Sequence, residues 1–144
     1  MWSDTLLAAE RSHLIRVVLW AVTCAVLGSA VVSTLTLRRV AAPIILAFAI
    51  QTLAWGSAEL IVAAARWQSL SMRDVSAATR LDRLTWFTVG LDVGIVGVGA
   101  AALVAARMSN RKLNVIGAGL GIIVQGLGLL VLDLTFAGIV ARLI

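Results

Sequence analysis

The chain has 144 residues, of which 61% are hydrophobic and 13% are charged, whereas soluble domains are about half apolar and about a quarter charged. This composition excludes an ordinary soluble domain. A formal net charge of +5 would suit nucleic-acid binding, but the basic residues lie at the ends of apolar runs, as membrane anchors do. We therefore expect a lipid bilayer, and no nucleic acid, as partner.

Four apolar runs divide the chain, and each is long enough to cross the hydrocarbon core, which takes about 20 residues of helix. Strand-like alternation is absent, and backbone groups in lipid must be paired within the segment, which favours helices. The sequence predicts an all-α fold: a polytopic membrane bundle of four helices, forming a single domain over 1–144. The predicted helices are 14–37, 41–65, 85–106 and 113–141.

The first run has basic residues before it and small residues at 28–30, a pattern that a signal peptide also shows. The apolar stretch nevertheless continues to Leu37, too far for a signal peptide, so we interpret it as the first membrane helix. Cys24 is the one cysteine of the chain, which excludes an internal disulfide.

The long connection 67–84 has polar side chains at helical spacing on one face. These are Arg73, Ser76, Arg80 and Arg83. Ser71 and Asp74 form a plausible helix start of the capping-box kind. We expect a short amphipathic helix lying on the membrane surface. It would serve either as a platform for lipid headgroups or a partner, or only as a solvated connector.

The basic residues are divided unevenly between the two sides of the predicted bundle. The side with both termini holds seven of the 12: Arg11, Arg16, Arg66, Arg73, Arg80, Arg83 and Arg142. The other side holds Arg38, Arg39, Arg107, Arg111 and Lys112. The positive-inside rule then places both termini in the cytoplasm, in a bacterial inner membrane.

The second and fourth runs resemble each other. In each, an acid follows a glutamine after eight residues: Glu59 follows Gln51, and Asp133 follows Gln125. The two copies are 74 residues apart, close to half of the 144-residue chain. The spacing indicates two hairpins inserted in the same orientation and related by duplication, with a short chance match as the alternative. The two glutamines would form a polar layer near the middle of the membrane.

Three acids lie within the apolar runs: Glu59, Asp92 and Asp133. Each is separated from an arginine on the termini side by about 10–14 Å of helix, so the three share one layer. A charged aspartate near a helix centre costs about 2.5–3.5 kcal/mol. We therefore expect the acids to face the bundle interior and to pair, with Arg16 of the first helix as the natural partner.

Glycines recur on one face of the third and of the fourth helix. They are Gly90, Gly94 and Gly97 in the third, and Gly117, Gly121 and Gly128 in the fourth. Small residues allow close approach of helices in lipid. Each helix also has small residues on the opposite face. We therefore expect a homo-oligomer or a larger membrane complex, assembled through the third and fourth helices.

The glycines at 117, 119 and 121 resemble a nucleotide-binding loop, but no strand precedes them and no Walker lysine follows. A Ser/His pair, a histidine cluster and a cysteine pair are all absent. His13, the one histidine, is a weak candidate for a haem or chlorophyll ligand. We therefore predict no enzymatic activity, no cofactor and no metal site.

Two segments resemble small uncharacterised bacterial four-helix membrane proteins of a domain-of-unknown-function type. They are Gly-Leu-Asp-Val-Gly at 90–94, and Gly-x-Gly-x-Gly-Ile-Ile-Val-Gln-Gly at 117–126, which leads to Asp133. Trp55 and Gly56 belong to the same pattern. The resemblance covers the last three helices. It implies the fold and a membrane location but no function.

Two functions fit these features. In one, the protein is a protomer of a proton- or cation-linked transporter or channel, with the three acids as the ion site and the glutamines continuing the path. In the other, it is a non-catalytic accessory or assembly subunit of a larger membrane complex. In that case the acids are structural, bonded to Arg16 and to hydroxyls such as those of Thr23 and Thr52.

Overall fold

The computed structural model describes residues 2–109 and 112–143, which form four α-helices and no strand. The helices are α1 (Trp2–Leu37), α2 (Pro43–Gln68), α3 (Val75–Met108) and α4 (Leu113–Leu143). Each is long and apolar enough to cross a membrane. The prediction of an all-helical protein with four such segments is confirmed. Arg111, counted above among the basic residues of the far side, lies outside the described residues.

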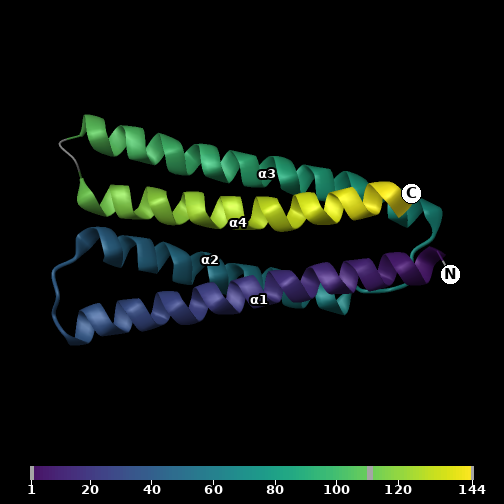
Figure 1. The fold of residues 1–144 in the computed structure, drawn as a ribbon, viewed down its shortest axis with the longest axis horizontal. Helices are drawn as coiled ribbons and strands as arrows, with labels where there is room; N and C mark the ends of the chain where they lie inside the picture. Colours follow the sequence, from purple (N-terminus) through teal and green to yellow (C-terminus); the bar gives the residue numbers. More distant parts are fainter. Residues whose placement is uncertain (1, 110–111, 144) are drawn as a thin grey trace.

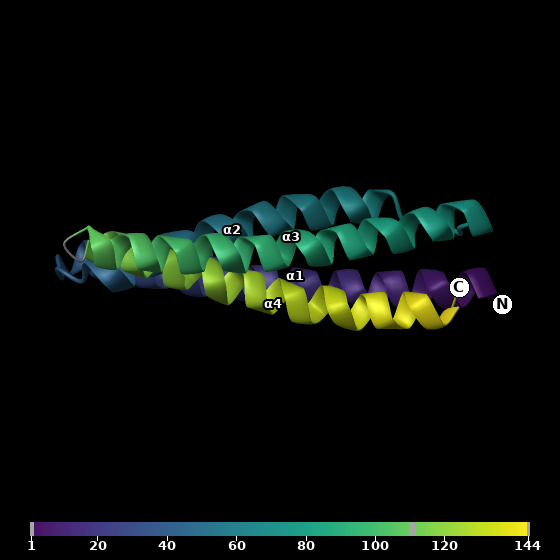
Figure 2. The same cartoon turned by 90° about the horizontal axis from the view of Figure 1, so that it is seen from above.

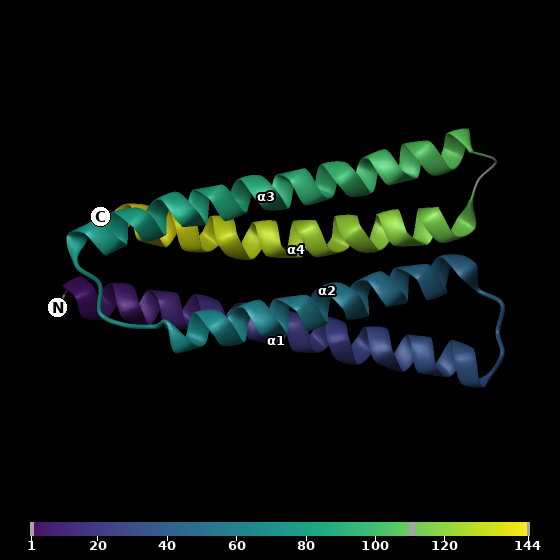
Figure 3. The same ribbon diagram turned by 180° about the vertical axis from the view of Figure 1, so that it is seen from behind.

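The helices form two antiparallel hairpins, and both ends of the chain lie at the same end of the bundle (Figure 1). Seen from above, the bundle is long and narrow (Figure 2). From behind, α4 lies between α3 and α2 (Figure 3). Within the described chain, α4 approaches the backbones of all the other helices, whereas α3 approaches that of α4 alone. The central position of α4 explains why so much of it is buried.

Two helices are longer than the sequence predicts. α1 has 36 residues and begins at Trp2 rather than at 14, and α3 has 34 and begins at Val75 rather than at 85. A helix of this length spans about 50 Å, well beyond the hydrocarbon core. The predicted surface helix over 67–84 is therefore wrong: its first residues end α2, 69–74 form a connection, and the rest begins α3.

The start of α3 is capped by Asp74, whose Oδ1 accepts hydrogen bonds from the Ala77 backbone N–H (2.7 Å) and the Ser76 hydroxyl (2.9 Å). These bonds favour the carboxylate and hold the pKa of Asp74 below its usual value. Asp74 is thus the N-cap itself, and not the second member of a capping box begun by Ser71 as predicted. Ser71 lies in the connection before it and is not the cap.

The extra turns of α1 and α3 pack against the end of α4. Leu6, Ala78, Phe136 and Val140 form a buried core there, with Ala9, Leu81 and Leu143 beside it. Ala78 and Leu81 of the segment 75–84 thus face protein, whereas Val75 and Leu84 remain exposed. Helical periodicity indicates that a segment has an apolar face, and it does not say whether lipid or another helix covers it.

Both glycine faces of α4 pack inside the chain. A Cβ at Gly121 would lie 2.8 Å from the Gln51 Cβ of α2, and one at Gly119 would lie 2.9 Å from the Gly99 carbonyl of α3. Gly117 likewise lies against the Ile44 backbone, and Gly128 against the Trp20 ring. The expectation that these α4 glycines face a second protomer is therefore wrong, because α1, α2 and α3 already cover them.

The glycine face of α3 is different. A Cβ built at Gly90, Gly94 or Gly97 meets no described atom within 4 Å. This face is open in the single chain, as the sequence led us to expect for one face of a helix in an isolated bundle.

We expect Gly56→Ala to destabilise the bundle by about 1–3 kcal/mol, the usual cost of overpacking. Its Cβ would lie 2.7 Å from the Ala21 carbonyl oxygen and from the Ala25 amide nitrogen, which are backbone atoms that cannot move aside alone. Gly138→Ala is the control, because it has open space and gains helix propensity. Thermal unfolding in detergent measures both, and equal midpoints would contradict the prediction.

Candidate functional site

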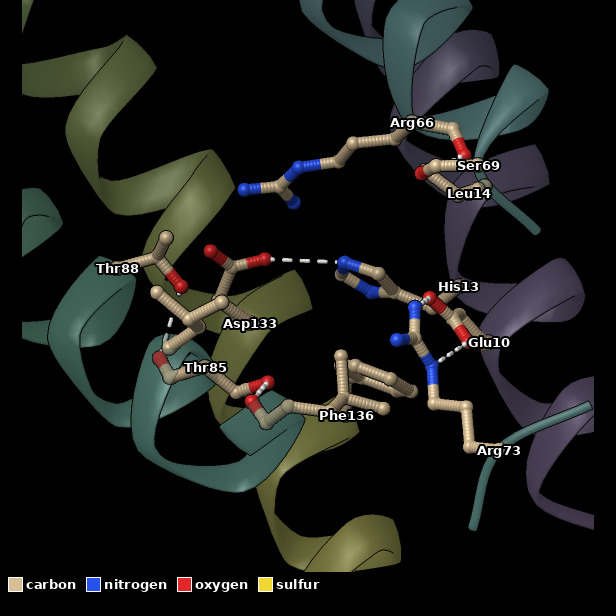
Figure 4. A pocket seen from close by; sticks show the side chains of 12 residues that line it. Glu10, His13, Leu14, Arg66, Ser69, Arg73, Thr85, Thr88, Asp133 and Phe136 are labelled. Carbon is tan, nitrogen blue, oxygen red and sulfur yellow. Dashed lines mark hydrogen bonds and ion pairs between the residues drawn. The ribbon is translucent and has the colours of Figure 1, made fainter. Parts of the chain in front are cut away.

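A polar cavity of about 170 Å³ lies at the end of the bundle that holds both termini. All four helices and the connection between α2 and α3 contribute to its lining (Figure 4). Its polar lining includes Glu10, His13, Arg66, Arg73, Thr88 and Asp133. The cavity therefore collects charges of both signs from segments far apart in the sequence.

The inner wall of the cavity is a contact between a histidine of α1 and an aspartate of α4. His13 Nε2 lies 3.2 Å from Asp133 Oδ1, and both side chains are buried. The imidazole stacks on Phe136, with 4.3 Å between ring centroids and 12° between planes. Phe136 is one turn from Asp133 on α4. One helix face thus supplies both the charged and the aromatic contact that hold the imidazole in place.

Arg16, the predicted partner of the acids, does not lie in this cavity. Its side chain is exposed and borders hollows on the outer surface between α1 and α4. The rotation of α1 about its axis decides this: it turns His13 toward α4 and Arg16 outward. The sequence analysis considered His13 only as a weak cofactor ligand and so missed its role.

Asp92 and Glu59 both interact electrostatically with Asp133. The Asp92 carboxyl is close enough to interact with those of Asp133 and Glu59. One of its oxygens, Oδ2, is buried and has no hydrogen-bond partner in the described part of the chain. Glu59 also interacts electrostatically with Arg66, whose guanidinium points into the cavity (Figure 4). The structure thus brings the three intramembrane acids together, one each from α2, α3 and α4.

An ion pair closes the outer side of the cavity. Arg73 Nη2 donates to Glu10 Oε1 at 2.6 Å, and Arg73 Nε donates to Glu10 Oε2 at 2.9 Å. The Glu10 carboxylate raises the pKa of Arg73 above its usual value through these bonds. This bidentate pair ties the α2–α3 connection to α1. Sequence reasoning missed Glu10, although its position three residues before His13 puts both on one helix face.

The two glutamines do not face each other: Gln125 of α4 faces α1, and Gln51 of α2 packs on another face of α4. Gln125 is fully buried and accepts a hydrogen bond from the Trp20 indole N–H of α1 at 3.0 Å. Gln51, on α2, packs its Cβ against the position of Gly121. The hydroxyls of Thr23 and Thr52 donate to carbonyls of their own helices, those of Leu19 and Phe48. The structural interpretation expected these hydroxyls to be partners of the acids, and this expectation is wrong.

The donor geometry bears on what the cavity can hold. Within 2–109 and 112–143, no group of three His, Cys, Asp or Glu side chains is arranged to hold a metal ion.

Residues 16–134 match the model of DUF6992, a protein family of unknown function. The match spans the three acids, both glutamines, Arg16 and the six glycines singled out from the sequence. It leaves out Glu10 and His13. No curated protein and no solved structure matches the chain.

We expect Glu10→Gln and Arg73→Gln each to destabilise the protein by about 1–3 kcal/mol, because each leaves a largely buried charge without its partner. The double variant should cost less than the sum of the two. Arg83→Gln, at an exposed position on α3, is the control. Thermal midpoints in detergent give the comparison. Additive effects of the two single changes would show that the pair contributes nothing.

Proposed function

The chain belongs to the DUF6992 family of unknown function, and we propose from its site geometry that it handles protons in the membrane. In this proposal it is a non-enzymatic protomer of a proton- or cation-linked transporter, and the cavity is its proton entry site. The protein lies in a bacterial inner membrane, and both termini lie on the cytoplasmic side, which holds more of the basic residues.

One observation carries this proposal: each helix contributes one titratable side chain to a single cluster. They are His13 of α1, Glu59 of α2, Asp92 of α3 and Asp133 of α4. Buried ionisable groups are costly in a membrane and typically mark ion or proton pathways. A purely structural ion pair needs two groups, and this cluster has twice as many.

The cluster links protonation to helix packing. Carboxylates on three different helices repel one another when they are charged. A proton taken up by any of them weakens this repulsion and favours closer approach of α2, α3 and α4 around the cavity. Uptake of a proton therefore has the means to shift the packing of the helices, which coupled transport requires.

The far half of the bundle favours a transporter over an open channel. There Gly117 and Gly121 pack on α2, and Gly119 packs on α3, at distances that leave no room even for a Cβ. A proton that enters the cavity would need the helices to separate before it could leave on the other side. The absence of a three-ligand metal arrangement among the described side chains favours a proton over a divalent cation.

We expect vesicles containing the wild-type protein to take up protons under an imposed potential, measured with an internal pH dye. Glu59→Gln, Asp92→Asn and Asp133→Asn should each lower the rate toward that of empty vesicles, because each removes one proton site of the cluster. His13→Phe should do the same, while it retains a ring that can stack on Phe136.

Asp82→Asn is the matched control for Asp92→Asn. It makes the same chemical change on the same helix, ten residues earlier, at a residue that does not itself line the cavity. Its rate should equal that of the wild type. Wild-type vesicles no faster than empty ones, or equal rates in wild type and all cluster variants, would overturn the proposal.

The second candidate function is an accessory subunit, and the open face of α3 supports it. Gly90, Gly94 and Gly97 leave room for close helix contact, and no described part of this chain fills it. In that function the cluster serves only to fix the relative positions of the helices.

Gly94→Leu should then break assembly, because it fills the open face without touching the fold of the single chain. Gly138→Leu, at another open position on α4, is the control. Native mass measurement after gentle solubilisation reports the assembly. An unchanged mass for Gly94→Leu would exclude this face as the contact. Gly121→Leu would not discriminate, since it clashes with Gln51 inside the chain.

A further inference from the structure

A second hollow lies on the outer surface of the bundle, away from the polar cavity. It is an open groove of about 540 Å³ between α1 and α4. Its lining is mainly apolar and includes Leu19, Trp20, Gly128, Val131 and Leu132, with Arg16 at one end. Along α1 the groove extends from Arg16 to Thr23, a distance of about 10 Å along the helix axis.

The floor of the groove is preformed. A Cβ at Gly128 would collide with the Trp20 ring, so only glycine lets the indole lie flat against the α4 backbone. The indole N–H donates to the buried Gln125 Oε1 at 3.0 Å, which fixes the orientation of the ring. A groove whose floor is held in this way does not need to be ordered by its occupant, which lowers the cost of binding.

Arg16 gives the groove its charge. No hydrogen bond or ion pair joins its guanidinium to any other residue in 2–109 or 112–143. It also borders a smaller hollow of about 80 Å³ on the side nearer the termini, lined in part by Ser12 and Ile139. Arg16 thus stands between an apolar groove and a small hollow that has the Ser12 hydroxyl, His13 and Phe136 in its lining.

We propose that this groove binds an anionic phospholipid. The phosphate lies on Arg16 within reach of the Ser12 hydroxyl, and an acyl chain follows the groove along Trp20 and Val131. The order of the side chains along α1 matches a lipid, with the charge at the start of the apolar run and the apolar surface deeper. Basic pockets between membrane helices bind lipid headgroups in this way. A free phosphate would leave the apolar groove empty.

The test measures lipid retained by the purified protein in detergent, by native mass spectrometry, with phosphatidylglycerol and phosphatidylcholine of the same acyl chains. The wild type should retain phosphatidylglycerol preferentially. Arg16→Gln should lower this retention about fivefold, the usual worth of one basic residue near a lipid surface. Arg83→Gln, an exposed arginine that borders neither hollow, should leave it unchanged.

A second pair of variants tests the acyl part. Val131→Trp fills the groove from a side chain that is 63% exposed, and Ile61→Trp makes a similar change on α2 at a side chain that is 72% exposed. Only Val131→Trp should lower retention of both lipids. Equal retention of the two lipids by the wild type, equal effects of the two arginine changes, or equal effects of the two tryptophan changes would overturn the proposal. The lipid measurement does not depend on proton uptake. A failure of the proton-uptake proposal would therefore not contradict lipid binding in the groove.

Discussion

In the inner wall of the cavity, His13 Nε2 of α1 lies 3.2 Å from Asp133 Oδ1 of α4, and the rest of the site depends on this buried contact. Removing one partner leaves the polar atoms of the other buried without a hydrogen bond, which typically costs about 1–3 kcal/mol. Here the cost falls on an acid that already interacts with Asp92. The imidazole thus gives the Asp133 carboxyl a partner on another helix, and the Arg66 guanidinium of α2 borders the same cavity. The Phe136 ring stacked on the imidazole fixes its position.

The central position of α4 explains how the two halves of the bundle differ. Toward the far end, glycines on both of its faces let α2 and α3 approach closely. Toward the termini, Asp133 and Phe136 replace the glycines, and the helices surround a cavity. One helix therefore combines a tightly packed half with a charged, hollow half. This division is what makes a one-sided proton site physically reasonable.

The candidate site could be predicted in part. Counting residues from the nearest arginine places Glu59, Asp92 and Asp133 at one depth, and the structure brings them together. The histidine partner of Asp133 could not be predicted in this way. Arg16 and His13 are close in sequence and at similar depth, and only the rotation of α1 against α4 decides which of them faces the acids. Periodicity gives the faces of one helix, but it does not give the angle between two.

The sequence by itself determined that the chain is helical, that four segments can cross a membrane, and that acids lie within them, because these properties follow from composition and spacing along one dimension. The tertiary structure decided which groups meet. It showed that the turns before Thr85 pack on α1 and α4 as part of α3, that the glycines of α4 are covered within the chain, and that Glu10 pairs with Arg73. Each of these outcomes depends on contacts between segments far apart in the sequence, and hydropathy does not distinguish an apolar face against lipid from one against another helix.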